Sequence, residues 1–267
     1  MSVKSRITIF FVSVLVCIGC DFKMQSVEQE HASLSVPIQR YDRLETRFLT
    51  TGDYSALQQM NTNYPRQTRT LLEDILALGE VNDASIHSRF LSLFQDTLLQ
   101  EVITDVELKY ANVDDLEKQL SAAFDQLRKW FPSMEMPHVY AQISALDQSI
   151  VVGGNMIGIS LDKYLGSDYP LYDRFYSEQQ KSTMKRSYIV PDCLCFYILS
   201  MYPLDGFEES SQEVRDIHMG RVMWVANKAM GKRFFKSPAV EKIEAFMKKS
   251  PKMSKKKLMD VKAEELL

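Results

Sequence analysis

Histidines are the first residues in this sequence to test for metal chemistry, and their spacing decides the outcome. The four histidines are His31, His87, His138 and His218, and no two of them are four residues apart. That spacing is what places two imidazole ligands of zinc on one helical face. The sequence also has no G-x-S-x-G elbow, Walker loop or EF-hand loop. We therefore expect neither a zincin-type zinc site nor any other metal or cofactor.

Two cysteines offer a nucleophile. Cys193 and Cys195 lie in an apolar stretch, and either thiol could meet His218 in the fold to form a nucleophile and base. Apolar surroundings raise a thiol pKa and suppress the thiolate, which is the reverse of what catalysis needs. A disulfide between residues two apart would be strained. We interpret both cysteines as small buried hydrophobic residues and assign no catalytic residue.

A run rich in aspartate and tyrosine, residues 162–176, is the remaining candidate for acid–base chemistry. Together with Asp192 it could supply the pair of carboxylates that glycosidase-like hydrolases use. The chain has 35 acidic residues, however, so loose clusters are expected by chance. Tyrosines in such a run also have a simpler structural interpretation, in which their hydroxyls bond to the backbone. A hydrolase that uses residues 162–176 is therefore one of two candidate functions; the other, non-catalytic binding, is given below.

The beginning of the chain has the pattern of a bacterial lipoprotein signal. A basic start precedes an apolar run, residues 7–19, which is too short to cross a hydrocarbon core of about 30 Å. The run ends in a small residue followed by Cys20, which resembles the lipobox where such proteins are cleaved and acylated. A diacylglycerol and an N-acyl chain on Cys20 would suffice for stable membrane attachment. We predict a signal peptide over residues 1–19 and a polar tether over residues 20–35.

Composition and charge limit the class of protein. The 267 residues are 45% hydrophobic and 25% charged, as in an ordinary globular protein, and the formal charge of −3 gives no reason to expect nucleic acid as a partner. The charge is uneven, because residues 232–267 contain eleven Lys or Arg against five Asp or Glu. This basic end is either a solvated helix or tail, or a surface for anionic headgroups.

The elements that must position these residues follow from hydrophobic periodicity. Spacings of three and four predict helices over residues 53–64, 66–78, 84–110, 112–131, 189–201 and 213–230. Alternation and a Gly-Gly-Asn turn predict a strand at 36–41, a strand at 138–146 and a hairpin at 149–160. We predict an α+β fold, mostly α-helical, with a small central β-sheet or hairpin. Its expected organisation is one domain over residues 36–231 followed by a basic C-terminal helix or tail over residues 232–267.

Several motifs in this order and spacing resemble those of the GldB family, the gliding motility lipoproteins of the Bacteroidota. The lipoprotein signal and the Arg40-Tyr41-Asp42 segment also fit the family. The motifs are residues 157–166 (IGISLDKYLG), 168–172 (DYPLY), 188–192 (YIVPD) and 218–224 (HMGRVMW). The candidate residues of a binding groove that they provide are Asp162, Tyr164, Gly166, Tyr172, Pro191, Asp192, His218, Gly220, Arg221 and Trp224.

The resemblance implies a lipid-anchored protein of the cell envelope, in the outer membrane or periplasm rather than the inner membrane. In gliding members such a protein supports the motility and secretion machinery, so the expected function is non-catalytic binding of a protein or peptide partner. The family is also distantly similar to zincin-like metallopeptidases. The helix at residues 189–201 would stand where their zinc helix lies, but it contains no histidine. A degenerate peptidase scaffold without metal is therefore a hypothesis that rests on fold-level analogy.

Overall fold

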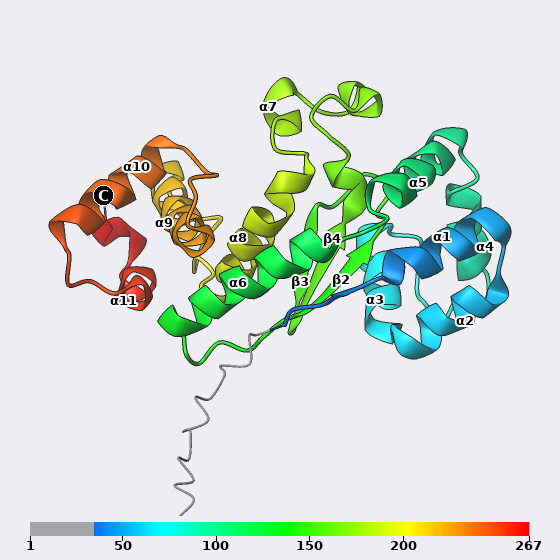
Figure 1. Cartoon of the computed structure of the whole chain (residues 1–267), viewed down its shortest axis with the longest axis horizontal. Coiled ribbons are helices and arrows are strands. Elements are labelled where there is room, and N and C mark those ends of the chain that lie inside the picture. Colours follow the sequence, from blue (N-terminus) through cyan, green and yellow to red (C-terminus); the bar gives the residue numbers. More distant parts are fainter. Residues whose placement is uncertain (1–34, 267) are drawn as a thin grey trace, which may run out of the picture. The chain divides into compact units, whose positions relative to one another are not determined.

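A small mixed β-sheet positions the motif residues (Figure 1). The computed structural model describes residues 35–266, so the predicted signal peptide, Cys20 and nearly all of the tether lie outside the described residues. The strand order is β1-β2-β4-β3, in which β2 is parallel to β1 and β4, and β3 is antiparallel to β4. The strands are β1 (Ile38–Gln39), β2 (His138–Gln142), β3 (Ile150–Gly153) and β4 (Met156–Ser160). The predicted α+β fold, mostly helical with a small sheet, is confirmed.

The predicted strands exist but are shorter than expected. The hairpin of β3 and β4 is confirmed, and it turns at Gly154, whose φ is 58°. Strand β2 ends at Gln142, before the left-handed backbone of Ala145 (φ 52°) and Leu146 (φ 66°). Strand β1 is only two residues long because a helix begins at Tyr41. The alternation of side chains was therefore a correct guide to the strands, and local backbone geometry set their ends.

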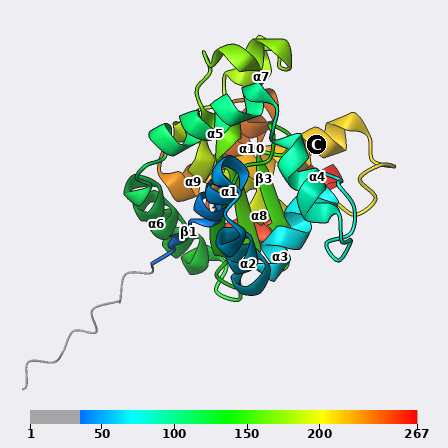
Figure 2. The ribbon, with the colours of Figure 1, turned by 90° about the vertical axis from the view of Figure 1, so that its right-hand side faces the viewer.

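Helices from the first part of the chain gather at one end of the sheet, the end that faces the viewer in Figure 2. The first of them was not predicted, since buried acidic residues interrupt its apolar period. The helix predicted over residues 84–110 is two helices, because the Asp96 side chain accepts a hydrogen bond from Leu98 N (2.8 Å) and starts the second one. These helices are α1 (Tyr41–Thr51), α2 (Tyr54–Asn63), α3 (Pro65–Arg69), the π-helix η1 (Thr70–Ile75), α4 (Ile86–Leu93) and α5 (Thr97–Lys109).

Helix α6 (Asp114–Trp130) confirms the most regular periodicity in the sequence. Its N-cap is Val113, and the side-chain oxygen of the preceding Asn112 accepts a hydrogen bond from Asp114 N (2.8 Å). The helix also supplies a hydrogen-bond acceptor to strand β1, because Ile38 N donates to the Glu117 carboxylate at 2.8 Å. The exposed edge of β1 is thereby joined to α6.

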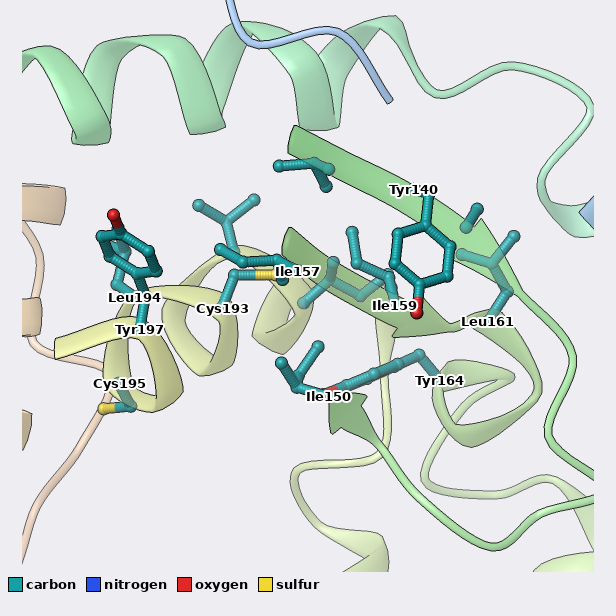
Figure 3. Packing of buried hydrophobic residues seen from close by; sticks show 14 of the residues in the cluster. Tyr140, Ile150, Ile157, Ile159, Leu161, Tyr164, Cys193, Leu194, Cys195 and Tyr197 are labelled. Atoms are coloured by element: carbon teal, nitrogen blue, oxygen red, sulfur yellow. The ribbon is translucent and has the colours of Figure 1, made fainter. Parts of the chain in front are cut away.

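Helix α8 (Ile189–Met201) has the predicted bounds, and most of its apolar side chains are buried, although Phe196 is 41% exposed. It packs against β3 and β4, with Cys193 directed toward Ile157 and Cys195 on the other side of the helix (Figure 3). Both cysteines are free, and burial raises the pKa of both thiols. The segment between the hairpin and α8 forms η2 (Leu161–Tyr164), η3 (Pro170–Arg174), α7 (Glu178–Lys181) and η4 (Arg186–Tyr188).

The C-terminal helices pack on one another at the other end of the sheet from α1–α5 (Figure 1). They are α9 (Gln212–Met230), α10 (Pro238–Lys249), α11 (Lys255–Asp260) and η5 (Ala263–Leu266). Gly220 lets α9 and α10 approach, since a Cβ there would lie 2.7 Å from the Ala239 Cβ. The basic end of the chain is thus folded onto α9, with Val240 and Leu258 buried and most lysines at the surface. None of the helices within residues 35–266 is long and apolar enough to span a bilayer.

Candidate functional site

The motif aspartate Asp162 lies just beyond the C-terminal ends of the parallel strands β2 and β4. It is fully buried, and its carboxylate accepts hydrogen bonds from the backbone N–H groups of Ser144 (3.1 Å) and Leu146 (2.6 Å). Burial raises the pKa of Asp162, and these backbone donors oppose the rise. The aspartate therefore holds the loop that follows β2 against the segment that follows β4.

The same loop is clamped from a second direction. Lys163 Nζ donates to the carbonyls of Leu146 and Asp147 (3.1 Å each) and to the Tyr176 hydroxyl (2.8 Å), and Tyr176 in turn donates to the Leu146 carbonyl. Left-handed backbone at Ala145 and Leu146 is costly for residues with side chains and persists only when the surroundings hold it. Asp162, Lys163 and Tyr176 supply that restraint.

Two tyrosine hydroxyls near the motif aspartate bond to the backbone. Tyr172 donates to the Asp162 carbonyl and accepts from Leu165 N (2.9 Å), and Tyr110 donates to the Tyr164 carbonyl (2.6 Å). Gly166 follows directly, with a φ of 132° that favours glycine. Asp162, Tyr164, Gly166 and Tyr172 thus form one group of neighbouring residues, the Asp162 cluster. They belong to the packed interior and do not form the wall of an open groove.

Asp192 joins this cluster from the first turn of α8. The Tyr164 hydroxyl donates to Asp192 Oδ2 at 2.8 Å. Burial raises the pKa of Asp192 to about 7, and the bond from Tyr164 opposes the rise. Its neighbour Pro191 is buried, whereas Asp192 is partly exposed. A carboxyl that titrates near neutrality and is in reach of solvent is the most chemically suggestive group among the motif residues.

The other motif residues lie along α9 and contact the C-terminal helices that pack on it. The Arg221 guanidinium lies 2.7 Å from His218 Nδ1 and donates to the carbonyls of Leu258 (3.3 Å) and Val261. Burial, followed by the charge of Arg221, lowers the pKa of His218 to about 4, so the imidazole is neutral at pH 7. His218 and Arg221 are buried, Arg221 fixes α11 to α9, and Gly220 allows α9 and α10 to approach.

Trp224 lies beside an open hollow. The hollow has a volume of about 340 Å³ and lies between the C-terminal part of α9 and α10. The Trp224 indole N–H donates to the Glu244 carboxylate, which also pairs with Lys228 at 3.0 Å. These contacts lower the pKa of Glu244. The lining residues are Trp224, Asn227, Lys228, Gly231, Lys232, Arg233, Val240, Glu244 and Lys248.

Glu45 is a site residue that the sequence did not reveal. It projects from the unpredicted helix α1, is fully buried, and accepts a hydrogen bond from Ile143 N at 2.8 Å. Burial raises its pKa well above the ordinary value, and the nearby Asp42 and Asp162 raise it further. The detectable signal is the spacing of Tyr41, Glu45 and Phe48 on one helical face, which becomes visible only if a glutamate is allowed on that face.

Metal binding is not supported by the geometry of residues 35–266, in which no group of three His, Cys, Asp or Glu side chains is placed to hold an ion. Helix α8 packs against the hairpin of β3 and β4 and contains no histidine.

Comparison with known proteins identifies the family. The family model described as gliding motility protein GldB matches residues 23–233, which include the Asp162 cluster, α8 and α9. No match was found among curated proteins or among solved structures. The chain therefore belongs to the GldB family, and it is a lipoprotein related to gliding motility.

Proposed function

We propose that this protein is a non-catalytic component of the gliding motility machinery, held in the envelope by lipid on Cys20, that binds a protein or peptide partner. The observation that carries this proposal is the use of the motif side chains. Asp162, Lys163 and Tyr172 each form hydrogen bonds with the backbone of their own chain. A motif built in this way stabilises a scaffold and leaves binding to the surface.

The groups that could act as nucleophile or base also support a non-catalytic role. Burial raises the pKa of the Cys193 and Cys195 thiols, so neither forms the thiolate that attacks a substrate. His218 is buried, neutral and in contact with Arg221. The hollow beside Trp224, in contrast, is open to solvent and large enough for one or two side chains.

Affinity purification from crosslinked envelopes tests the proposal. The tagged wild-type chain should recover a motility or secretion component, and a Cys20→Ala variant should leave the membrane and lose that component. Failure to recover any protein with the wild-type chain would refute partner binding. A Cys20→Ala protein that stays in the membrane fraction would refute the lipid anchor.

A hydrolase is the second candidate, and the observation in its favour is the carboxyl of Asp192. Its raised pKa and its hydrogen bond from Tyr164 would suit a general acid. Incubation of the purified protein with casein and with peptidoglycan, followed by mass spectrometry, tests this candidate. Products that form with the wild-type protein and not with Asp192→Asn would establish hydrolysis and overturn the non-catalytic proposal.

A further inference from the structure

The hollow between α9 and α10 has an excess of three positive charges among its lining residues. Lys228, Lys232, Arg233 and Lys248 line it, and Glu244 is the single acidic lining residue. We propose that this hollow binds an acidic peptide segment of a partner protein. The inference rests on the proposed function, because it names the chemistry of the partner and the place where that partner binds.

Glu244 does not neutralise the excess positive charge of the hollow. Its carboxylate already accepts a hydrogen bond from Trp224 and pairs with Lys228, and Lys248 lies 3.9 Å from it. Lys232 has no carboxylate within ion-pair distance among the described residues, and its ammonium lies 5.2 Å from the centre of the Phe234 ring. Among the described residues, the ion-pair partner of Arg233 is the exposed Glu241, at 3.2 Å, outside the hollow's lining. Lys232 and Arg233 are therefore the cations most available to a carboxylate from another molecule.

The loop that carries these two cations is held in place before any ligand arrives. Asn227 accepts hydrogen bonds from the N–H groups of Phe234 (2.8 Å) and Phe235 (3.0 Å), and its amide donates to the Phe235 carbonyl (2.9 Å). Gly231 ends α9 in the left-handed conformation, and the N–H of Lys232 caps the Asn227 carbonyl at 3.2 Å. A preformed site loses less conformational entropy on binding, so the charges can be used efficiently.

The shape of the site favours a peptide over a membrane surface. A bilayer is flat on this scale and would meet protruding lysines, whereas a recess of about 340 Å³ admits individual side chains. Trp224 and Val240 give the recess an apolar part beside its cations. The matching ligand is a segment in which glutamate or aspartate neighbours an apolar side chain.

Fluorescence anisotropy on the full lipidated chain in a zwitterionic detergent tests the proposal. The probe is a labelled peptide of alternating glutamate and leucine, compared with its lysine-for-glutamate counterpart. We expect saturable binding of the acidic peptide only, weakened by salt. A Lys232→Glu, Arg233→Glu double variant should bind at least tenfold more weakly.

The matched control is an Arg66→Glu, Lys118→Glu double variant. It makes the same change of charge at exposed residues on α3 and α6, and its affinity should change less than twofold. Thermal melting followed by circular dichroism checks that both variants fold. Equal weakening in both variants, or unchanged binding by the Lys232/Arg233 variant, would overturn the proposal.

Two further arms separate the possible ligands. Phosphatidylglycerol vesicles that bind through Lys232 and Arg233, with no binding of the acidic peptide, would overturn the peptide proposal in favour of lipid. Competition by millimolar inorganic phosphate at constant ionic strength would show a generic anion site and would also overturn it. If the Lys232/Arg233 variant still recovers the wild-type partner from crosslinked envelopes, the proposed function stands and this site is wrong. If the wild-type chain recovers no partner, the proposed function itself fails.

Discussion

Replacement of Asp192 by asparagine should stabilise the protein at neutral and alkaline pH and leave its stability near pH 4 unchanged. The pKa of Asp192 rises from 3.8 to about 7 because the carboxyl is buried at the start of α8. A raised folded-state pKa means that the folded protein holds the proton more tightly than the unfolded chain does. The stabilisation from this proton is complete below about pH 4 and is lost as the pH rises through about 7.

The magnitude follows from the size of the pKa change. Each pKa unit corresponds to about 1.4 kcal/mol, so a rise from 3.8 to about 7 corresponds to about 4 kcal/mol at pH values above 7. Asp192 is partly exposed, and water screens some of this penalty, so we expect the variant to be about 2–4 kcal/mol more stable than the wild type at pH 8. The amide oxygen of asparagine can still accept the hydroxyl of Tyr164.

Urea unfolding at pH values from 4 to 8, followed by the fluorescence of Trp130 and Trp224, measures this difference. Glu45 and Asp162 also have raised pKa values, but they are present in both proteins and cancel. An Asp168→Asn variant, which makes the same substitution at an exposed aspartate, is the control for the change of side chain. If Asp192→Asn is no more stable at pH 8, or if its advantage is the same at every pH, the electrostatic reasoning is wrong.

Three further changes test the packing of the motif residues. Gly220→Ala should lower the free energy of unfolding by about 1–3 kcal/mol despite the better helix propensity of alanine, because the new Cβ would lie 2.7 Å from the Ala239 Cβ; an unchanged or raised melting temperature would contradict this. Asp162→Ala should cost about 2–5 kcal/mol in urea unfolding, since it leaves two buried backbone N–H groups without an acceptor, and Asp162→Asn should cost less. Arg221→Met should speed hydrogen exchange in α11 at least tenfold and leave α6 unaffected, because it removes the bonds to the Leu258 and Val261 carbonyls; equal protection in α11 would show that these bonds do not hold it.

Elements with long and regular apolar patterns could be predicted from the sequence. Helices α6, α8 and α9 and the β3–β4 hairpin lie where the periodicity places them, since their buried faces are apolar and turn residues mark their ends. Helix α1 was missed for the opposite reason. It buries Asp42 and Glu45, so its inward face does not read as apolar. Buried acidic residues whose hydrogen-bond partners lie far away in the sequence cannot be predicted from a local hydrophobic pattern.

The candidate site could be predicted only in part from the sequence, for a similar reason. Resemblance to a family identified Asp162 and Tyr164, yet nothing in the sequence reveals what they bind. The partners of Asp162 are backbone N–H groups of a loop whose residues Ala145 and Leu146 adopt left-handed conformations. Neither residue type favours that conformation, so the loop depends on the tertiary contacts that it helps to form.

Apart from Trp224, the residues of the family motifs differ from the residues that we expect to bind the partner. The motif residues Asp162 and Tyr172 are buried, whereas Lys232 and Arg233 are exposed. The proposed hollow is completed by Val240, Glu244 and Lys248, which follow the end of the match at residue 233. A chain that keeps the Asp162 cluster but carries other residues on α10 should keep this fold and bind a different partner. On our proposal, the chemistry of the hollow, rather than the family motif, distinguishes the partner of this protein.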